Sequence, residues 1–253
     1  MKTVIVTGAS SGLGREFAEA LGNLPSVEEV WVIARRKERL EELRSTVGAT
    51  VVPLELDLSR NESLDTYRNY LADRTPQVVA LVNAAGYGCM GEVENLSLSD
   101  QRGMIDLNIT ALTAITKLTL PYMGQGGEIY QLGSFSAFEP LPYMSVYAAT
   151  KAYVLSFSRS LNRELKSRGI HSMAVCPSWV RTEFLDRAAT YRDVIVYFDR
   201  FYTPKQVVGR AMRDMKRGKD VSVCGAKHRF LRLLTKLFPH RFVMSIWCFQ
   251  QKK

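Results

Sequence analysis

Tyr147 and Lys151 are the residues of this sequence whose types and spacing most directly suggest chemistry. They stand four positions apart in the stretch YAATK, and residues at i and i+4 share one face of a helix. A free phenol has a pKa of about 10, and a cation within about 4–6 Å favours the phenolate and lowers that pKa. A tyrosine tuned in this way can exchange a proton with a substrate oxygen near neutral pH. Taken alone, the pair is equally typical of an ordinary amphipathic helix.

Ser134 is the next candidate, because it stands thirteen residues before Tyr147 at the end of a predicted strand, in the stretch LGSFSAF. A hydroxyl placed there can donate a hydrogen bond to a carbonyl oxygen as negative charge develops on it. The small residues Ala148 and Ala149 allow a ligand to approach the predicted helix closely. We therefore expect a tyrosine, a lysine and a serine around one reacting carbonyl.

A sheet must position these side chains, and the sequence predicts one. Uninterrupted apolar runs rich in β-branched residues alternate with helical patterns, which is typical of a parallel sheet covered on both faces. We predict one α/β domain over residues 1–225, a doubly wound sheet of the Rossmann type with about seven parallel strands and helices on both faces. The predicted strands are 3–7, 29–34, 50–56, 78–83, 127–133, 171–176 and 220–224. The predicted helices are 13–21, 37–47, 63–73, 99–123, 145–168 and 205–217.

Ligands of such sheets bind beyond the carboxyl ends of the strands, so the residues that follow each strand are the most informative. The first predicted strand is followed by TGASSGLG. Gly8, Gly12 and Gly14 permit a tight turn and a close approach of the backbone to a diphosphate, at the positive end of the next helix. Ser10 and Ser11 add hydroxyl donors. This turn between a strand and a helix predicts a dinucleotide site.

The second predicted strand ends in VIARRKERL, which discriminates between two dinucleotides. Folds of this kind generally place an acid here for the ribose 2′-hydroxyl of NAD, whereas an arginine accommodates the 2′-phosphate of NADP. Arg35 and Arg36 occupy the place and no acid precedes Glu38, so we predict NADP(H). After the third strand, Asp57 either accepts from the adenine amino group, with Leu58 packed nearby, or caps the next helix. The residues leave both interpretations open.

Two further strand ends complete the predicted cleft. The fourth strand ends in VNAAG, where small residues let the chain pass close to a cofactor ribose and Asn83 can bridge backbone groups of neighbouring strands. The sixth ends in CPSWVRTEF, where Pro177 forces a bend and Thr182 offers a hydroxyl.

These motifs, in this order and spacing, resemble the single-domain type of the short-chain dehydrogenase/reductase superfamily. The resemblance covers residues 1–225 and rests on TGASSGLG, Asn83-Ala-Ala-Gly86, Asn108, Ser134, Tyr147-x-x-x-Lys151, and Pro177 with Thr182. The chain departs from the family pattern at Ala84, where a second asparagine is usual, and at Ser178, where glycine usually follows the proline.

The resemblance implies that Tyr147 is the general acid in reduction and the general base in oxidation. It implies that Lys151 binds the nicotinamide ribose and lowers the pKa of the phenol, and that Ser134 hydrogen-bonds the substrate oxygen. It further implies that Asn108 holds a water between Lys151 and solvent, and that a homodimer or homotetramer forms through the helices at 99–123 and 145–168. The residues expected to touch the dinucleotide are Gly8, Ser10, Ser11, Gly12, Leu13, Gly14, Arg35, Arg36, Asp57, Leu58, Asn83, Ala84, Ala85, Gly86, Tyr147, Lys151, Pro177, Val180 and Thr182.

The substrate pocket is expected at the segments 87–95, 136–144 and 179–203, of which the last is a candidate lid. Aromatic residues gather there, namely Phe135, Phe138, Tyr143, Trp179, Phe184 and Tyr191. They favour an apolar ketone or alcohol, steroid-like or with a long acyl chain, over a sugar. Each of these aromatic residues could instead belong to the core or to a subunit contact.

Composition excludes several other classes of protein. The net charge is +9, but residues 227–253 carry +7 of it with no acid, so the rest of the chain carries only +2 and nucleic acid is not an expected partner. The four cysteines are far apart, which predicts reduced thiols and no metal site. The start MKTVIVTGAS has too short an apolar run for a signal peptide, and no run of 18 apolar residues exists. We therefore expect a cytoplasmic protein.

The segment 226–253 extends past the resembling region as a basic tail. Phe230, Leu233 and Leu237 have helical spacing, Pro239 interrupts the pattern, and a second apolar stripe follows. Such a segment either lies on an anionic membrane surface or packs on its own domain or on a partner subunit.

Together, these observations predict an NADP(H)-dependent oxidoreductase that interconverts a small apolar ketone and a secondary alcohol. The alternative from another class is a noncatalytic dinucleotide sensor or a membrane-surface scaffold on the same fold. Such a protein has no need of Ser134, Tyr147 and Lys151 together.

Overall fold

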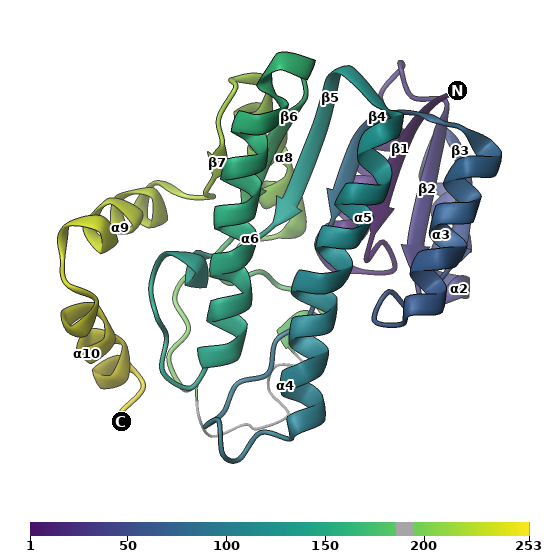
Figure 1. The fold of residues 1–253 in the computed structure, drawn as a ribbon. Coiled ribbons are helices and arrows are strands. Elements are labelled where there is room, and N and C mark those ends of the chain that lie inside the picture. Colours follow the sequence, from purple (N-terminus) through teal and green to yellow (C-terminus); the bar gives the residue numbers. More distant parts are fainter. Residues whose placement is uncertain (186–194, 253) are drawn as a thin grey trace.

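The computed structural model describes residues 1–185 and 195–252, and they build one parallel sheet (Figure 1). Its strands are β1 (Lys2–Thr7), β2 (Glu29–Ala34), β3 (Thr50–Glu55), β4 (Gln77–Asn83), β5 (Met123–Leu132), β6 (His171–Val175) and β7 (Val221–Ser222). Their spatial order is β3-β2-β1-β4-β5-β6-β7, so the order reverses between β1 and β4. The reversal point is where doubly wound sheets bind ligands. The predicted fold class is confirmed.

Helices cover both faces of the sheet because its strands are apolar on both sides. Successive strand residues face opposite ways, so Val4 and Val6 enter one core while Ile5 enters the other. The helices on the first face are α1 (Gly12–Gly22), α2 (Lys37–Glu41) and α8 (Pro204–Lys216). Those on the second face are α3 (Asn61–Arg74), α5 (Leu112–Thr119) and α6 (Ser145–Glu164).

The long helix predicted at 99–123 is a composite of several turns, and its predicted end is wrong. It consists of α4 (Leu98–Ile105), a π-helical turn η2 (Asp106–Ala111), α5 and a 3₁₀ turn η3 (Leu120–Tyr122). Pro121 cannot continue the α-helical hydrogen bonds, so the helix tightens and stops. Met123 is already the first residue of β5.

Other predicted boundaries shift by a few residues. The helix predicted at 37–47 ends α-helically at Glu41 and continues as the 3₁₀ turn η1 (Glu42–Ser45). The end of the helix predicted at 145–168 is the 3₁₀ turn η5 (Leu165–Arg168), and Ser134 caps an unpredicted turn η4 (Phe135–Phe138). The last strand, β7, has only two residues.

The basic tail forms two short helices, α9 (Ala226–Leu237) and α10 (His240–Gln250), which lie beyond β7 and α6 at the left of Figure 1. Pro239 separates them, as the sequence predicts. No helix among residues 1–185 and 195–252 is long and apolar enough to cross a membrane.

Two helical glycines test how tightly α1 packs against the turn that precedes it. A Cβ atom at Gly14 would overlap the carbonyl oxygen of Gly8, whereas a Cβ at Gly209 of α8 would lie 3.6 Å from its nearest neighbour. We expect Gly14→Ala to destabilise the fold by about 1–3 kcal/mol through overpacking. Gly209→Ala should stabilise it by about 0.5–1 kcal/mol, because alanine favours helix. Urea unfolding of both variants measures these changes, and equal effects would contradict the packing argument.

Candidate active site

A cleft of about 630 Å³ runs across the carboxyl ends of the strands β1 to β6. Its walls come from the loops that follow these strands, which is where the sequence places the site. The predicted residues in the walls are Gly8, Ser10, Ser11, Gly12, Leu13, Gly14, Arg35, Arg36, Asp57, Leu58, Ala84, Ala85, Gly86, Ser134, Tyr147, Lys151, Pro177, Val180 and Thr182. Asn83 and Asn108 line no part of it.

The glycine-rich turn forms one end of the cleft. Gly8 and Gly12 have φ angles of 68° and 56°, a region that disfavours other residues. A Cβ at Gly12 would come within 3.1 Å of the Thr182 side chain across the cleft. Ser11, the residue before α1, makes no side-chain capping bond, so the first N–H groups of that helix are left without a side-chain cap. The first three residues of the helix line the cleft. The turn therefore fits the diphosphate of a dinucleotide.

Two arginines and a glutamate meet next to this turn. Arg36 donates to the Ser10 hydroxyl at 3.1 Å and pairs with Glu183 at 2.8 Å, and Arg39 approaches the same carboxylate at 3.6 Å. The Arg36 hydrogen bond holds the pKa of Glu183 below its usual value. Arg35 is exposed and also lines the cleft. The cluster offers a cationic rim at the end of β2.

Asp57 does not cap the following helix, so one of its two interpretations is removed. The N-cap residue of α3 is Arg60. Asp57 instead accepts hydrogen bonds from the backbone N–H and the hydroxyl of Ser59, at 3.2 and 2.7 Å, and lies in the cleft wall beside Leu58.

The predicted contact of Asn83 with the dinucleotide is wrong, because the Asn83 side chain lies in the core and not in the cleft. Its Nδ2 atom donates to Thr116 at 2.9 Å and to Gln131 at 3.0 Å, so it links side chains and not strand backbones. The reason is strand alternation, which turns Asn83 towards α5 and leaves the following residues, 84–86, in the cleft.

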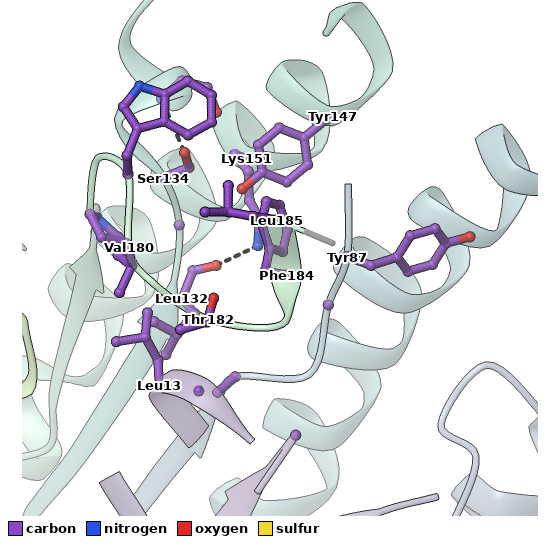
Figure 2. Close-up of a pocket in the computed structure, with 18 of the residues that line it drawn as sticks. Leu13, Tyr87, Leu132, Ser134, Tyr147, Lys151, Val180, Thr182, Phe184 and Leu185 are labelled. Carbon is purple, nitrogen blue, oxygen red and sulfur yellow. Dashed lines mark hydrogen bonds between the residues drawn. The ribbon is translucent and has the colours of Figure 1, made fainter. Parts of the chain in front are cut away.

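Tyr147, Lys151 and Ser134 come together in the middle of the cleft (Figure 2). Tyr147 and Lys151 extend from α6 on one helical face, and the Lys151 ammonium lies 5.7 Å from the centroid of the Tyr147 ring. Lys151 donates to the carbonyl oxygen of Leu132 at 2.8 Å, at the end of β5. Ser134 is in the turn that follows, so β5 and α6 together fix the three groups.

Burial dominates the protonation of the pair. It raises the pKa of Tyr147 to about 12, although the Ser134 hydroxyl acts in the opposite direction. Burial also lowers the pKa of Lys151 to about 8. Both side chains are almost fully buried, and desolvation is the largest cause of both shifts. The lowering of the phenol pKa by Lys151, which the family resemblance implies, stays a prediction.

Asn108 does not line the cleft, but it is hydrogen-bonded to Tyr87, which does. Its Nδ2 atom donates to the Tyr87 carbonyl at 2.9 Å and to the Thr150 hydroxyl at 3.0 Å, and its Oδ1 atom accepts from the Tyr87 N–H at 3.1 Å. The π-helical turn η2 supplies this residue, and such turns are frequent at functional sites. A Cβ at Gly86 would lie 2.7 Å from Asn108 Oδ1 and 3.5 Å from Lys151 Nζ, so both side chains reach the same side of that glycine.

The loop after β6 closes the opposite side of the cleft. The Pro177 carbonyl accepts from the N–H of Phe135 at 2.7 Å, and Val180 forms an isolated parallel bridge with Tyr202. Thr182, Phe184 and Leu185 then face the glycine turn and Tyr147, as Figure 2 shows.

Several of the aromatic residues predicted for the pocket do line it. Phe135, Trp179 and Phe184 are in its walls, and the rings of Phe184 and Tyr147 are 5.6 Å apart. Phe138 packs instead against Phe135 and under Arg232 of α9, and Tyr143 packs among buried apolar residues. Tyr191 lies outside the described residues.

The tail supplies walls that the sequence did not predict. Leu231 of α9 and Trp247 of α10 line the cleft, and the Trp247 indole N–H donates to the Pro142 carbonyl at 3.0 Å. His228 is buried against Tyr202 and Asp199, at 3.1 and 3.3 Å. The apolar stripes of the tail were the available signal, but they do not say which surface they contact.

Glu139 is a polar group in this mostly apolar region, and it was also missed. It lines the cleft, and within the described residues its buried Oε2 atom has no hydrogen-bond partner. Burial raises its pKa to about 7.

Comparisons with known proteins agree with this geometry. A family model described as short chain dehydrogenase matches residues 2–192. An NADP-dependent 3-hydroxy acid dehydrogenase of Schizosaccharomyces pombe is 33% identical over 190 residues, which are 72% of this chain and 73% of that protein.

Two solved structures are similar along nearly the whole chain. A short-chain dehydrogenase from Sphingobium yanoikuyae in complex with NADPH is 30% identical with a TM-score of 0.80, covering 97% of this chain and 96% of that one. A bulky-bulky ketone specific alcohol dehydrogenase from Comamonas testosteroni is 26% identical with a TM-score of 0.75, covering 97% and 94%.

The buried carboxyl of Glu139 predicts a pH-dependent stability. The pKa of Glu139 is raised from 4.5 to about 7 in the folded state, so folding favours the protonated carboxyl. The free energy of unfolding that this contributes is fully present below pH 4.5 and is lost as the pH rises through 7. Glu139→Gln should therefore gain free energy of unfolding relative to the wild type between these pH values. Urea unfolding across that range is the measurement. The exposed Glu94→Gln is the control, and parallel profiles for both variants would contradict the assignment.

Proposed function

The chain belongs to the short-chain dehydrogenase family and is an oxidoreductase that uses a nicotinamide dinucleotide, and from this premise we propose that it reduces a bulky, mainly apolar ketone with NADPH or oxidises the corresponding secondary alcohol. The observation that carries the proposal is the meeting of Tyr147, Lys151 and Ser134 in one cleft with a glycine turn suited to a diphosphate.

The preference for NADP(H) is supported by the cations at the end of β2. Arg35 and Arg36 line the cleft there, where a 2′-phosphate on the adenine ribose would lie. Asp57, which follows β3, lines the same end of the cleft, and in the proposal it accepts from the adenine amino group. Glu183 holds Arg36 through an ion pair in which both side chains are about half exposed. Such a pair is weak and can be exchanged for a phosphate.

In the proposed mechanism, the hydroxyls of Tyr147 and Ser134 hold the carbonyl oxygen of the ketone. The bound cofactor supplies the hydride. Tyr147 is protonated at neutral pH, since burial raises its pKa to about 12, and it donates its proton to the oxygen. The nearby Lys151 ammonium stabilises the phenolate that this transfer leaves behind. Oxidation uses the same groups in reverse, with Tyr147 as the base.

In this proposal Asn108 is a positioning residue, which supports the helix that carries Tyr147. It holds Thr150, whose hydroxyl donates to the Tyr147 carbonyl at 2.7 Å, and so it fixes the first turns of α6. Asn108 and Lys151 reach the same side of Gly86, which is compatible with a water between the two.

The proposed substrate is a ketone whose body is apolar and which carries one further polar group. Phe184, Trp179, Leu141 and Leu231 offer the apolar walls. The buried oxygen of Glu139 has no partner within the described residues, so a hydroxyl or amine on the substrate would satisfy it. The relative that acts on bulky-bulky ketones supports the size of the substrate.

Replacing Tyr147 tests the catalytic part of the proposal. We expect Tyr147→Phe to lower kcat by about 10²–10⁴-fold, because the proton donor is lost, while NADPH still binds. The control is Tyr153→Phe on the same helix, which loses only a surface hydrogen bond to Thr113. The measurement is NADPH consumption with a panel of bulky ketones, together with NADPH affinity. A wild type that binds NADPH yet turns over no ketone would favour a noncatalytic dinucleotide sensor.

Replacing Arg35 tests the cofactor preference. A charge-assisted contact with the 2′-phosphate contributes about 1.5–3 kcal/mol, so Arg35→Ala should weaken NADPH binding by about 10–100-fold. NADH, which lacks the phosphate, should bind with nearly unchanged affinity. The exposed Lys37→Ala controls for the loss of one nearby positive charge. Titration of both cofactors measures the effect, and an equal loss for both would reject the 2′-phosphate role.

A further inference from the structure

The outer surface of the two tail helices is apolar and exposed. On α9, the side chains of Phe230, Leu233 and Leu237 follow one another at helical spacing, and on α10 Phe242, Ile246 and Phe249 do the same. Leu237 is 76% exposed and Phe249 is 83% exposed. We call these six residues the outer tail face. Contiguous exposed apolar side chains of this kind mark a site of interaction.

The inner side of the same helices is fixed to the domain. Trp247 donates to the Pro142 carbonyl, and the Gln251 side chain accepts from the N–H groups of Val196 and Tyr197 at 2.9 and 3.0 Å. Lys227 pairs with Asp199 at 3.0 Å. The outer tail face is therefore held in a defined place. Its six side chains are 43–83% exposed, and Phe242 packs against Phe238 of the same tail.

Positive charge surrounds this face. Arg229, Lys236, Arg241 and Lys252 are exposed, and within the described part of the chain none of the four makes an ion pair. The segment 226–253 contains no acid. An apolar helical face bordered by lysine and arginine is the pattern of helices that lie in the interface of an anionic membrane.

The substrate cleft lies directly behind this face. Leu231 and Trp247 line the cleft from the inner side of α9 and α10. Tyr197 also lines it, and it is exposed together with its neighbours Val196 and Phe198. Gln251, just after α10, holds Val196 and Tyr197, and Phe198 packs against Trp179 in the cleft wall.

We propose that the outer tail face binds the surface of an anionic phospholipid bilayer and that the cleft takes its ketone from that bilayer. The second half of this inference rests on the proposed function, and the first half does not. The helices lie in the interface with the apolar side chains among the acyl chains and the four basic side chains at the phosphates. An apolar ketone concentrated in the bilayer then reaches the cleft past Tyr197.

A second copy of the chain is the less suitable occupant of this face. A two-fold contact would place the same patch on both sides of the interface. Two segments that each carry +7 would then face each other with no acid between them, and like charges facing each other are costly. The dimer implied by the family resemblance would use α5 and α6, which Figure 1 shows side by side on another side of the molecule.

Vesicle co-sedimentation of the full chain tests the inference. We expect the wild type to sediment with vesicles of phosphatidylcholine and phosphatidylglycerol, and much less with phosphatidylcholine alone. The variant Leu233→Ser/Leu237→Ser/Phe249→Ser should lose at least about tenfold in partitioning for each side chain removed from the acyl region. Its control is Val93→Ser/Leu98→Ser, which removes exposed apolar side chains from the segment before α4 and from its start.

A charge variant tests the electrostatic part separately. Each basic side chain near an anionic surface contributes about fivefold, so Arg229→Gln/Lys236→Gln/Arg241→Gln should lower partitioning by about 100-fold. Lys117→Gln/Lys216→Gln is the control away from the tail. Added salt should weaken the wild type and affect the charge variant less.

The outcomes distinguish this inference from its alternatives. The inference is overturned if the wild type does not sediment with the anionic vesicles. It is also overturned if the triple serine variant binds them as strongly as the wild type. A triple serine variant that lowers the molar mass in sedimentation equilibrium without lipid shows a contact between copies and also overturns it. All variants should keep wild-type turnover of a water-soluble ketone, because none of the changed residues lines the cleft. If the wild type lacks that turnover, the proposed function fails while the vesicle result remains valid.

Discussion

The close approach of the turn after β1 to the end of β4 is the contact on which the cleft depends. The Thr7 hydroxyl accepts from the N–H groups of both Ala84 and Ala85 at 3.1 Å, and a Cβ at Gly8 would lie 2.7 Å from the Ala85 nitrogen. These are the strands between which the sheet order reverses, so their chains leave in opposite directions. A side chain at position 8 would push the two chains apart, so the glycine keeps them close at the point where doubly wound sheets bind ligands.

Burial is the second organising factor, and it acts on the reactive groups in a consistent way. It raises the pKa of Tyr147 and lowers that of Lys151, so in the protein alone both groups are shifted towards their neutral forms. Some buried polar groups nearby have partners, as in the chain from Asn108 through Thr150 to the Tyr147 carbonyl. Two oxygens of the cleft wall, Ser136 Oγ and Glu139 Oε2, have no hydrogen-bond partner within the described residues.

Much of the fold and most of the cleft could be predicted because their signals are local. A glycine turn between a strand and a helix, or a tyrosine and a lysine at i and i+4, is visible within a few residues. Three features could not be read from the sequence because they depend on tertiary structure. They are the core-facing side of Asn83, the burial that raises the pKa of Tyr147, and the wall that Trp247 contributes from the far end of the chain. Pro121 is a local signal that the prediction overlooked, and it ends the helix predicted at 99–123 before Met123.

The burial of Lys151, which donates to the Leu132 carbonyl, has a thermochemical consequence. Because the pKa of Lys151 is about 8, part of the protein carries this side chain as a neutral amine in mildly alkaline buffer. A ligand that accepts a hydrogen bond from the ammonium favours the protonated form, so its binding draws a fraction of a proton from solution. Affinity then falls as the pH rises through 8. The heat of binding also includes the ionisation heat of the buffer, and it differs between phosphate and Tris at the same pH.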